Sequence, residues 1–357
     1  ACPCAVGLAT PVALAAGLNK AARNHILIRD TSALEQMRNV DVVVFDKTGT
    51  LTEGHPTVIG WLWAQGQEEH YKDVLLAAES TSDHPLAEAI VTALEGEEQV
   101  IPAHLDGFES IAGKGVRVAY QGAEYWVGSH KLLKDYQANL SDILADMLTQ
   151  YESDGNSIVY FGRENDLLAV IAIKDQLRVT SMEAIRELRI QDIEICMLTG
   201  DGERTASSVA GSLGIMRFVA DAMPDDKEDF IHKLQLQGKT VAMVGDGVND
   251  AQALSCADVS IAMGKGTDTL MDTAMITLRT SDLLLLPKVF RLSRQTVSLM
   301  YRNLFWAFIY NTVGIFVAAG VLYPVYDILL SPALAGAAMA LSCVSVALSS
   351  LRLSSRF

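Results

Sequence analysis

Three turns of the sequence carry carboxylates, and each follows an apolar run. They are Asp46 after Val40–Phe45, Asp201 after Ile193–Leu198, and the group Asp246, Asn249 and Asp250 after Thr240–Val244. A single Asp in such a place is usually a turn residue or a helix cap. Ligands of an open parallel α/β sheet bind at the carboxyl ends of its strands, so three such turns predict one shared site.

The chemistry that suits these residues is phosphoryl transfer. Asp46 can serve as a nucleophilic carboxylate. Mg²⁺ would neutralise phosphate charge, and it prefers hard oxygen ligands. Asp46 and Asp246 can converge on such an ion, with Asp250 or Asn249 close by.

Two further requirements are donors for the phosphoryl oxygens and a cation. Thr199 supplies a hydroxyl group and Gly200 a backbone N–H. Lys227 lies at the start of a helix that is predicted to pack on the same sheet, and its ammonium group can balance phosphate charge. We therefore expect these three residues at the same edge of the sheet as Asp46.

The elements that must position these residues alternate between strands and helices. Helical patterns at Ser181–Arg189 and Asp226–Gln235 lie between the apolar runs, which predicts a doubly wound parallel sheet, an α/β fold. Short strands and helices interrupt the alternation over residues 53–163. We interpret that stretch as an inserted α+β domain, which divides the sheet domain into residues 19–52 and 164–290.

The composition indicates a protein that is partly globular and partly in a membrane. Half of the 357 residues are hydrophobic, and the mean hydropathy is +0.23. The net charge of −15 makes nucleic acid an unsuitable partner. The five cysteines are too scattered for a disulfide framework, and we expect Cys196 and Cys256 to be reduced core residues.

Three apolar segments are predicted to lie in a membrane. Residues 1–18 resemble part of a transmembrane helix that Pro3 and Pro11 interrupt, and the stretches 298–323 and 328–351 each exceed the roughly 20 residues needed to cross a bilayer. Basic residues flank these segments on the side of the globular part, which places that part in the cytoplasm. The prediction is a multi-pass membrane protein in contact with the lipid bilayer.

The motifs around the three turns resemble those of P-type ATPases. Asp46–Thr52 is similar to the phosphorylation motif of that family, and Thr199–Gly202 and Met243–Ala251 are similar to its hinge motifs in order and spacing. The resemblance covers nearly the whole chain. It implies a haloacid-dehalogenase-like phosphorylation domain in which Asp46 is phosphorylated, Lys47 and Thr48 belong to the catalytic motif, and Thr48 joins the carboxylates around Mg²⁺.

Thr48 also separates a pump from a phosphatase. Soluble phosphatases of the wider superfamily usually carry an acidic residue two positions after the nucleophile, where it activates water. A Thr hydroxyl cannot act as that base near neutral pH. We therefore expect an aspartyl phosphate that persists, which favours a pump.

The inserted domain resembles the nucleotide-binding domain of the heavy-metal-transporting subclass. That resemblance implies contacts with ATP for Glu79, His84, Gly113, Gly115, Val116, Gly128 and Ser129. Taken alone, His84 could equally cap a helix beside Pro85, and glycine pairs are common in β-rich domains. Ser129 stands where the subclass usually has Asn, so a shorter side chain meets the nucleotide.

The apolar segments carry soft ligands. Cys2 and Cys4 flank Pro3, and thiolates select copper(I), although zinc also takes them. A redox or zinc pair in a loop is the alternative. The later segments complete a set that resembles the copper(I) pattern: Tyr310, Asn311, Met339 and Cys343, the last in place of the usual Ser. By the same resemblance, a zinc or cadmium pump would carry a Lys in the span 298–323 and an Asp in the span 328–351.

The family also implies parts that this sequence does not contain. Its pumps dephosphorylate through a Thr-Gly-Glu loop on an upstream actuator domain, and we interpret the chain as a fragment that lacks this region. The favoured function is ATP-driven copper(I) translocation, with a copper chaperone as an expected donor. The rivals are a zinc or cadmium pump, a membrane-tethered phosphatase of the same fold, and a non-enzymatic metal-binding remnant.

Overall fold

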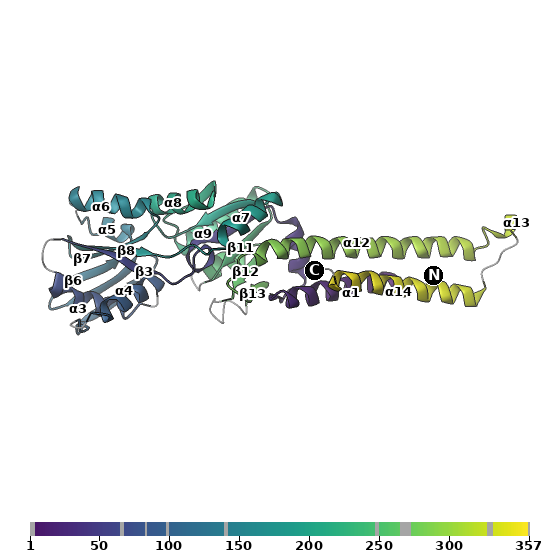
Figure 1. Cartoon of the computed structure of the whole chain (residues 1–357), viewed down its shortest axis with the longest axis horizontal. Coiled ribbons are helices and arrows are strands. Elements are labelled where there is room, and N and C mark those ends of the chain that lie inside the picture. The colour runs from purple at the N-terminus through teal and green to yellow at the C-terminus, as the bar shows by residue number, and fades with distance from the viewer. Residues whose placement is uncertain are drawn as a thin grey trace.

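The computed structural model describes residues 4–64, 68–82, 84–97, 100–138, 142–246, 250–264, 273–326 and 331–355. Its described parts follow one another along the long axis in Figure 1. A six-stranded sheet with its helices lies at one end, a seven-stranded sheet lies in the middle, and long helices extend from it to the other end.

The seven-stranded sheet has the doubly wound architecture that the sequence predicts. Its strands, in spatial order, are β1 (Ile26–Ile28), β13 (Ile276–Leu278), β12 (Val259–Met263), β11 (Val241–Gly245), β2 (Val42–Asp46), β9 (Glu194–Leu198) and β10 (Arg217–Val219). All neighbours are parallel except β1 and β13. Every residue of β2, β11 and β12 is buried, as expected of parallel strands covered on both faces.

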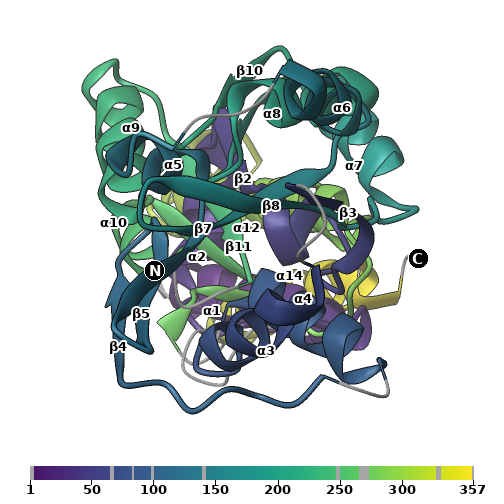
Figure 2. The same cartoon turned by 90° about the vertical axis from the view of Figure 1, so that its left-hand side faces the viewer.

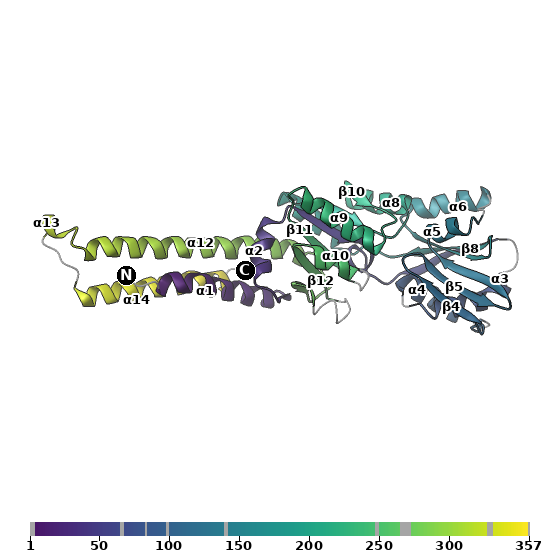
Figure 3. The ribbon, with the colours of Figure 1, turned by 180° about the vertical axis from the view of Figure 1, so that it is seen from behind.

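Helices cover the two faces of this sheet and close two apolar cores. On one face pack α2 (Ser32–Gln36), the short 3₁₀ helix η1 (Met37–Asn39), α7 (Ser181–Ile190), α8 (Glu203–Leu213) and the start of α12 (Leu285–Ala318). On the other face pack α9 (Pro224–Leu236) and α10 (Ala251–Cys256), which Figure 3 shows from behind. Because α9 and α10 pack on this face, their first residues lie near the carboxyl ends of the central strands.

The inserted region forms a six-stranded antiparallel sheet. Its strands, in spatial order, are β3 (Thr57–Trp63), β8 (Asp166–Lys174), β7 (Ser157–Arg163), β6 (Ala123–Gly128), β5 (Gly115–Tyr120) and β4 (Gly107–Ile111). One face carries α3 (Glu68–Glu79) and α4 (Pro85–Glu95), and the other carries α5 (His130–Asp135) and α6 (Asp142–Ser153), as Figure 2 shows. The sequence predicts most of these elements but omits β4, β8 and α5.

Strand β8 corrects the predicted end of the insert. It lies beyond residue 163, and it pairs with both β3 and β7. The sheet of the insert therefore extends to Lys174. The sequence misplaces this boundary because a buried apolar strand, such as Leu167–Ile173, looks the same in an antiparallel sheet as in the parallel sheet that follows.

Three helices extend away from the globular part and pack against one another: α1 (Cys4–Arg23), α12 and α14 (Pro332–Ser355). Helix α1 continues through Pro11, where the sequence predicts an interruption, and past residue 18. Helix α12 ends at Ala318 rather than at residue 323, because Gly320 adopts φ +85° and the chain leaves the helix there. The single turn α13 (Tyr323–Tyr326) follows.

Within the described residues, one helical segment is both long enough and apolar enough to cross a membrane, Ala333–Leu353. Large apolar side chains are also exposed along α12, among them Phe305, Phe308 and Phe316. An exposed apolar surface of this kind usually marks a contact with a membrane or with another protein surface. The structure thus supports a membrane span for α14. The other predicted spans stay predictions.

Candidate phosphoryl-transfer site

The three carboxylate-bearing turns meet at one edge of the seven-stranded sheet. Strand β2 lies between β11 and β9, and Asp46 pairs in register with Leu198, the residue before Thr199. Val244 pairs with Phe45 on the other side, so Asp246 emerges beside Asp46. Asp46 itself is buried, with 6% of its surface exposed. The predicted convergence at the carboxyl ends of the strands is confirmed for the residues that the structure describes; Asn249 lies outside them.

Lys227 holds two of the carboxylates together. Its Nζ lies 2.5 Å from Oδ1 of Asp46 and 2.7 Å from Oδ1 of Asp250, and all three side chains are buried. Burial alone would lower the pKa of Lys227, but the two carboxylates outweigh it and raise that pKa. The lysine is therefore charged at neutral pH and faces the carboxylate expected to react.

Lys47 points to a different partner. Its ammonium group forms an ion pair with Asp201 and donates a hydrogen bond of 3.1 Å to Oγ of Ser157. Burial would raise the pKa of Asp201, but Lys47 outweighs it and holds that pKa below its usual value. Ser157 is the first residue of β7, so Lys47 ties the motif to the inserted sheet. The sequence gives no signal for Ser157, because 110 residues separate it from Lys47.

The turn after Asp46 wraps around its carboxylate. The N–H of Thr48 donates to Oδ2 of Asp46 at 3.0 Å, which orients the carboxylate. Gly49 follows with φ +68°, and a Cβ built there would lie 1.5 Å from Oδ2 of Asp246. Only glycine combines this backbone conformation with so close an approach. The turn therefore brings Asp246 directly against the motif.

Two residues that the sequence did not identify support this turn. Arg178, buried, donates through Nε to the Thr50 carbonyl at 3.0 Å and through a terminal nitrogen to the Gly49 carbonyl. Asp175 accepts from Oγ1 of Thr52 at 2.5 Å, and its other oxygen accepts from the backbone N–H of residue 54 at 3.1 Å. Arg178 and Asp175 follow β8, far along the chain, so only the fold brings them here.

The donor set fits a hard divalent cation. Asp46 and Asp250 share the ammonium group of Lys227, and Asp246 lies against the turn that follows Asp46. Carboxylate oxygens are ligands that Mg²⁺ prefers. Burial raises the pKa of Asp246 to about 7, and the negative charges of Asp46 and Asp250 add to the rise. Repulsion among these groups is what a bound cation would relieve. Binding of Mg²⁺ by these carboxylates stays a prediction, and their chemistry is compatible with it.

The insert presents His84 toward the same site. His84 caps the start of α4, where its Nδ1 accepts the N–H of Leu86 at 3.2 Å. Its side chain is exposed, yet the surrounding protein lowers its pKa, and the charges that act on it are those of Asp201, Asp46, Lys47 and Lys227. The capping alternative is therefore confirmed, and the ring also lies within electrostatic reach of the site.

Glu79 lies at the carboxyl end of α3 on the same side of the insert. It is 6% exposed, and burial raises its pKa to about 7. A carboxyl group with this pKa is partly protonated at neutral pH and can donate as well as accept a hydrogen bond. That property suits a contact with a nucleobase edge.

The predicted nucleotide glycines have a structural role that the sequence did not reveal. Gly115 pairs with Gly128, and a Cβ at Gly115 would lie 2.1 Å from the Val127 carbonyl oxygen. The side chain of Val116 is buried in the core of the insert, so this position can meet a ligand only through its backbone. These glycines permit the close approach of two strands.

The neighbouring turn retains features suited to a ligand. Gly113 has φ +67°, and a Cβ there would lie 2.8 Å from Cε of Met223, which precedes α9. The turn thus lies against the helix that carries Lys227. Oγ of Ser129 is buried and has no hydrogen-bond partner among the residues that the structure describes, although the backbone N–H of Ser129 donates to the Lys114 carbonyl at 2.8 Å. An unpaired buried hydroxyl is a polar group that a ligand could satisfy.

The predicted metal-path residues lie along the long helices. Cys2 is outside the described residues, and Cys4 begins α1. Cys343 packs against a small core formed by Ala9, Ala307 and Val346, so it faces both α1 and α12. Asn311 donates to the carbonyl of Ala307 at 2.9 Å. Cys343 therefore lies at the three-helix contact.

Two other members of that set are more open. Tyr310 is 49% exposed and stacks on Trp306, with 5.8 Å between ring centroids. Met339, one helical turn before Cys343, is 44% exposed. The described residues thus place Cys343 inward and leave Tyr310 and Met339 partly uncovered.

The fold and this edge of the sheet define a known class. A family model described as haloacid dehalogenase-like hydrolase matches residues 40–258. Because this match covers more than half of the chain, the protein belongs to the haloacid dehalogenase-like hydrolase family.

Within that class the chain is similar to heavy-metal-transporting P-type ATPases. It is 43% identical to a copper-exporting P-type ATPase of Legionella pneumophila, over 99% of this chain and 48% of the relative. It is 44% identical to a silver exporting P-type ATPase of Salmonella typhimurium, over 99% of this chain and 43% of the relative. The resemblance found in the motifs is confirmed, and the chain spans about half the length of these curated relatives.

Solved structures of similar proteins have the same fold as this chain. A zinc-transporting PIB-type ATPase in the E2.Pi state superposes with a TM-score of 0.68 and 35% identity, over 99% of this chain and 56% of that one. The catalytic domain of a CPx-ATPase superposes with a TM-score of 0.63 and 28% identity, over 76% of this chain and 97% of that one. These matches confirm the predicted combination of a haloacid dehalogenase-like domain with an inserted domain and adjoining helices.

Proposed function

We propose that this chain is the catalytic part of an ATP-driven copper(I) pump that forms an aspartyl phosphate at Asp46. The observation that carries the proposal is the setting of Asp46. Its carboxylate lies between the N–H of Thr48 and the ammonium group of Lys227, with Asp246 and Asp250 beside it. This arrangement orients a nucleophile and balances the charge of a phosphoryl group that arrives next to it.

In the proposed reaction, a carboxylate oxygen of Asp46 attacks the γ-phosphorus of ATP. A new carboxyl O–P bond forms while the bond from the γ-phosphorus to the bridging oxygen breaks, and ADP leaves. Lys227 offsets the negative charge of nucleophile and phosphoryl group, and Thr199 and Gly200 supply donors to the phosphoryl oxygens. Mg²⁺, when bound by Asp46, Asp246 and Asp250, would neutralise charge shared by the phosphate and these carboxylates.

The presence of Thr48 two positions after Asp46 supports a pump rather than a phosphatase. Thr48 directs its backbone N–H to Asp46, and its hydroxyl is too weak a base to activate water. The intermediate would then survive long enough to drive a rearrangement of the helices. Dephosphorylation would depend on the actuator loop that the family resemblance implies.

ATP would bind to the insert on the side that faces Asp46. His84 feels the charges of the phosphorylation site, and the turn at Gly113 contacts the residue before α9. Among the described residues, the Ser129 hydroxyl has no hydrogen-bond partner, and Glu79, whose pKa burial raises, suits a base edge. Gly115, Val116 and Gly128 would contribute through the backbone.

Copper(I) is the cargo that the soft ligands favour. Cys2, Cys4, Met339 and Cys343 offer sulfur, and thiolate and thioether ligands select Cu(I). Relatives named for copper and for silver both match this chain, and silver(I) has the same soft chemistry. The zinc-transporting structure keeps zinc as the second candidate. The pump would be a multi-pass membrane protein with its catalytic part in the cytoplasm, supplied with copper by a chaperone.

Beryllium fluoride offers a test that needs neither ATP nor the actuator region, because it ligates a carboxylate and mimics an acyl phosphate. With Mg²⁺ and beryllium fluoride at about 100 times the dissociation constant, we expect the purified chain to gain about 2.7 kcal/mol in its free energy of unfolding. An Asp46→Asn variant should gain nothing, whereas Asp229→Asn, at an exposed position of α9, should behave as the wild type. Equal stabilisation of Asp46→Asn would contradict the proposal.

A further inference from the structure

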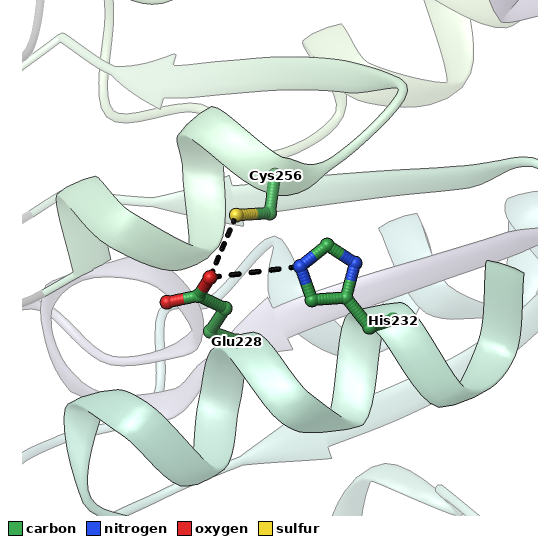
Figure 4. Close-up of side chains that lie close together, drawn as sticks. All are labelled: Glu228, His232 and Cys256. Carbon is green, nitrogen blue, oxygen red and sulfur yellow. Dashed lines mark hydrogen bonds and ion pairs between the residues drawn. The ribbon is translucent and has the colours of Figure 1, made fainter.

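A second group of potential ligands lies on the surface formed by α9 and α10, outside the site of Asp46. It consists of Glu228, His232 and Cys256, and we call it the α9–α10 site. Figure 4 shows the three side chains pointing toward one another, two from α9 and one from the last residue of α10. Their ligand atoms all lie within 4.8 Å of one another.

Cys256 differs from the core residue that the sequence predicts. Cys196 is fully buried in the sheet, but Cys256 is only partly buried, and its Sγ contacts Oε1 of Glu228 at 3.4 Å. The side chains of Glu228 and His232 are 36% and 50% exposed. An ion in solution can therefore reach all three. Cys256 is a free thiol, as predicted, but it lies at the margin of the core rather than inside it because it is the last residue of the short helix α10.

The spacing of the ligand atoms suits a tetrahedral metal ion. Bonds of 2.0–2.3 Å at tetrahedral angles place two zinc ligands about 3.3–3.7 Å apart. Oε1 of Glu228 lies 3.4 Å from Sγ of Cys256 and 3.5 Å from Nε2 of His232. Glu228 and His232 are four residues apart on one helix face, a spacing that lets two side chains of a helix share one ion.

A neighbouring residue prepares His232 for this role. Oε1 of Gln235 lies 3.1 Å from Nδ1 of His232, and an amide oxygen can only accept a hydrogen bond. Nδ1 therefore carries the proton, and Nε2, the nitrogen facing Glu228, keeps its lone pair for a metal. Metal-bound histidines are commonly oriented in this way. The Nε2 group of Gln235 also donates to the Cys256 carbonyl at 2.9 Å, which joins α9 to the end of α10.

We propose that the α9–α10 site binds one Zn²⁺ ion, with Glu228, His232 and Cys256 as ligands and a water molecule in the fourth position. One thiolate, one imidazole and one carboxylate form the mixed donor set that zinc accepts, whereas copper(I) favours sulfur without carboxylate. The ion would join α9, which carries Lys227, to α10, which starts next to Asp250. The proposal is independent of the cargo and of phosphorylation at Asp46.

The test uses cobalt(II) as a spectroscopic substitute for zinc in the full-length chain. Cys2, Cys4 and Cys343 are first replaced by Ser, so that the thiols left are Cys256 and the fully buried Cys196. Titration of this background with Co²⁺ should produce a thiolate-to-cobalt charge-transfer absorption that saturates at one equivalent, and one equivalent of Zn²⁺ should abolish it. Cys256→Ser should remove the absorption, and His232→Gln should weaken zinc binding about 10–100-fold in chelator competition.

His104→Gln, at an exposed position of the insert, is the matched control and should leave the titration unchanged. Circular dichroism of the metal-free variants should be the same as that of the background, since the replaced side chains are at the surface. Absorption that persists in Cys256→Ser, or no absorption in the background, would overturn the proposal. Tight binding of Cu(I) without binding of Co²⁺ or Zn²⁺ would overturn the assignment to zinc.

Discussion

Replacing Lys227 by Met is expected to slow phosphorylation of Asp46 by ATP about 10²–10³-fold, the cost of removing one preorganised charge-stabilising donor. The Lys227 ammonium lies 2.5 Å from Asp46 and 2.7 Å from Asp250, and Met replaces the aliphatic part of the side chain but lacks the terminal ammonium group. The repulsion between the carboxylates and the incoming phosphate is then unopposed. Rapid-quench measurement of phosphoenzyme formation at saturating ATP gives the rate.

The same substitution should lower the free energy of unfolding by about 3–5 kcal/mol in the absence of Mg²⁺, because it leaves two buried carboxylates without their partner. Lys233→Met, on the exposed side of the same helix, is the control and should change neither quantity appreciably. A phosphorylation rate for Lys227→Met within threefold of the wild type would show that Lys227 is only a structural ion-pair partner.

Replacing Gly49 by Ala is expected to abolish phosphorylation. A Cβ at Gly49 would lie 1.5 Å from Oδ2 of Asp246, so either Asp246 or the turn must move. Displacement of either one separates the carboxylates that are proposed to hold Mg²⁺. A misplacement of about 1 Å near reacting groups can by itself cost about 10²-fold. The phosphoenzyme yield and the Mg²⁺ concentration needed for half-maximal yield would be measured together.

Gly122 provides the matched control for backbone strain. It has φ +78°, close to the +68° of Gly49, but no atom of the other described residues, its two chain neighbours aside, lies within 4 Å of its Cβ position. Gly122→Ala should therefore lose only the cost of the left-handed conformation, about 1–2 kcal/mol, and should be phosphorylated normally. If Gly49→Ala reached the phosphoenzyme level of Gly122→Ala, the close contact with Asp246 would have no catalytic significance.

The sequence was sufficient to locate the central strands and the site. Largely apolar runs identify β2, β9 and β11 to within two residues, because strands buried on both faces need apolar residues at nearly every position. The turns that follow them converge as the topology of a parallel sheet requires. Lys227 was also predicted, since its helix lies between two of these strands in the chain.

Features that depend on contacts between distant segments could not be predicted. Arg178 and Asp175 reach the motif turn only after the insert has folded back, and nothing in the local sequence marks them. The Gly115–Gly128 contact is likewise a property of strand pairing. The end of the insert was misplaced because β8 is as apolar as a parallel strand, and the exposure of Cys256 depends on which neighbours cover α10.

The central claim, an acyl phosphate at Asp46, is tested most directly with labelled ATP and Mg²⁺. We predict that the purified wild-type chain acquires a label that is stable in acid and is released by hydroxylamine, and that Asp46→Asn acquires none. A label that resists hydroxylamine, a label that persists in Asp46→Asn, or an absence of label in a chain that still binds nucleotide would contradict the account.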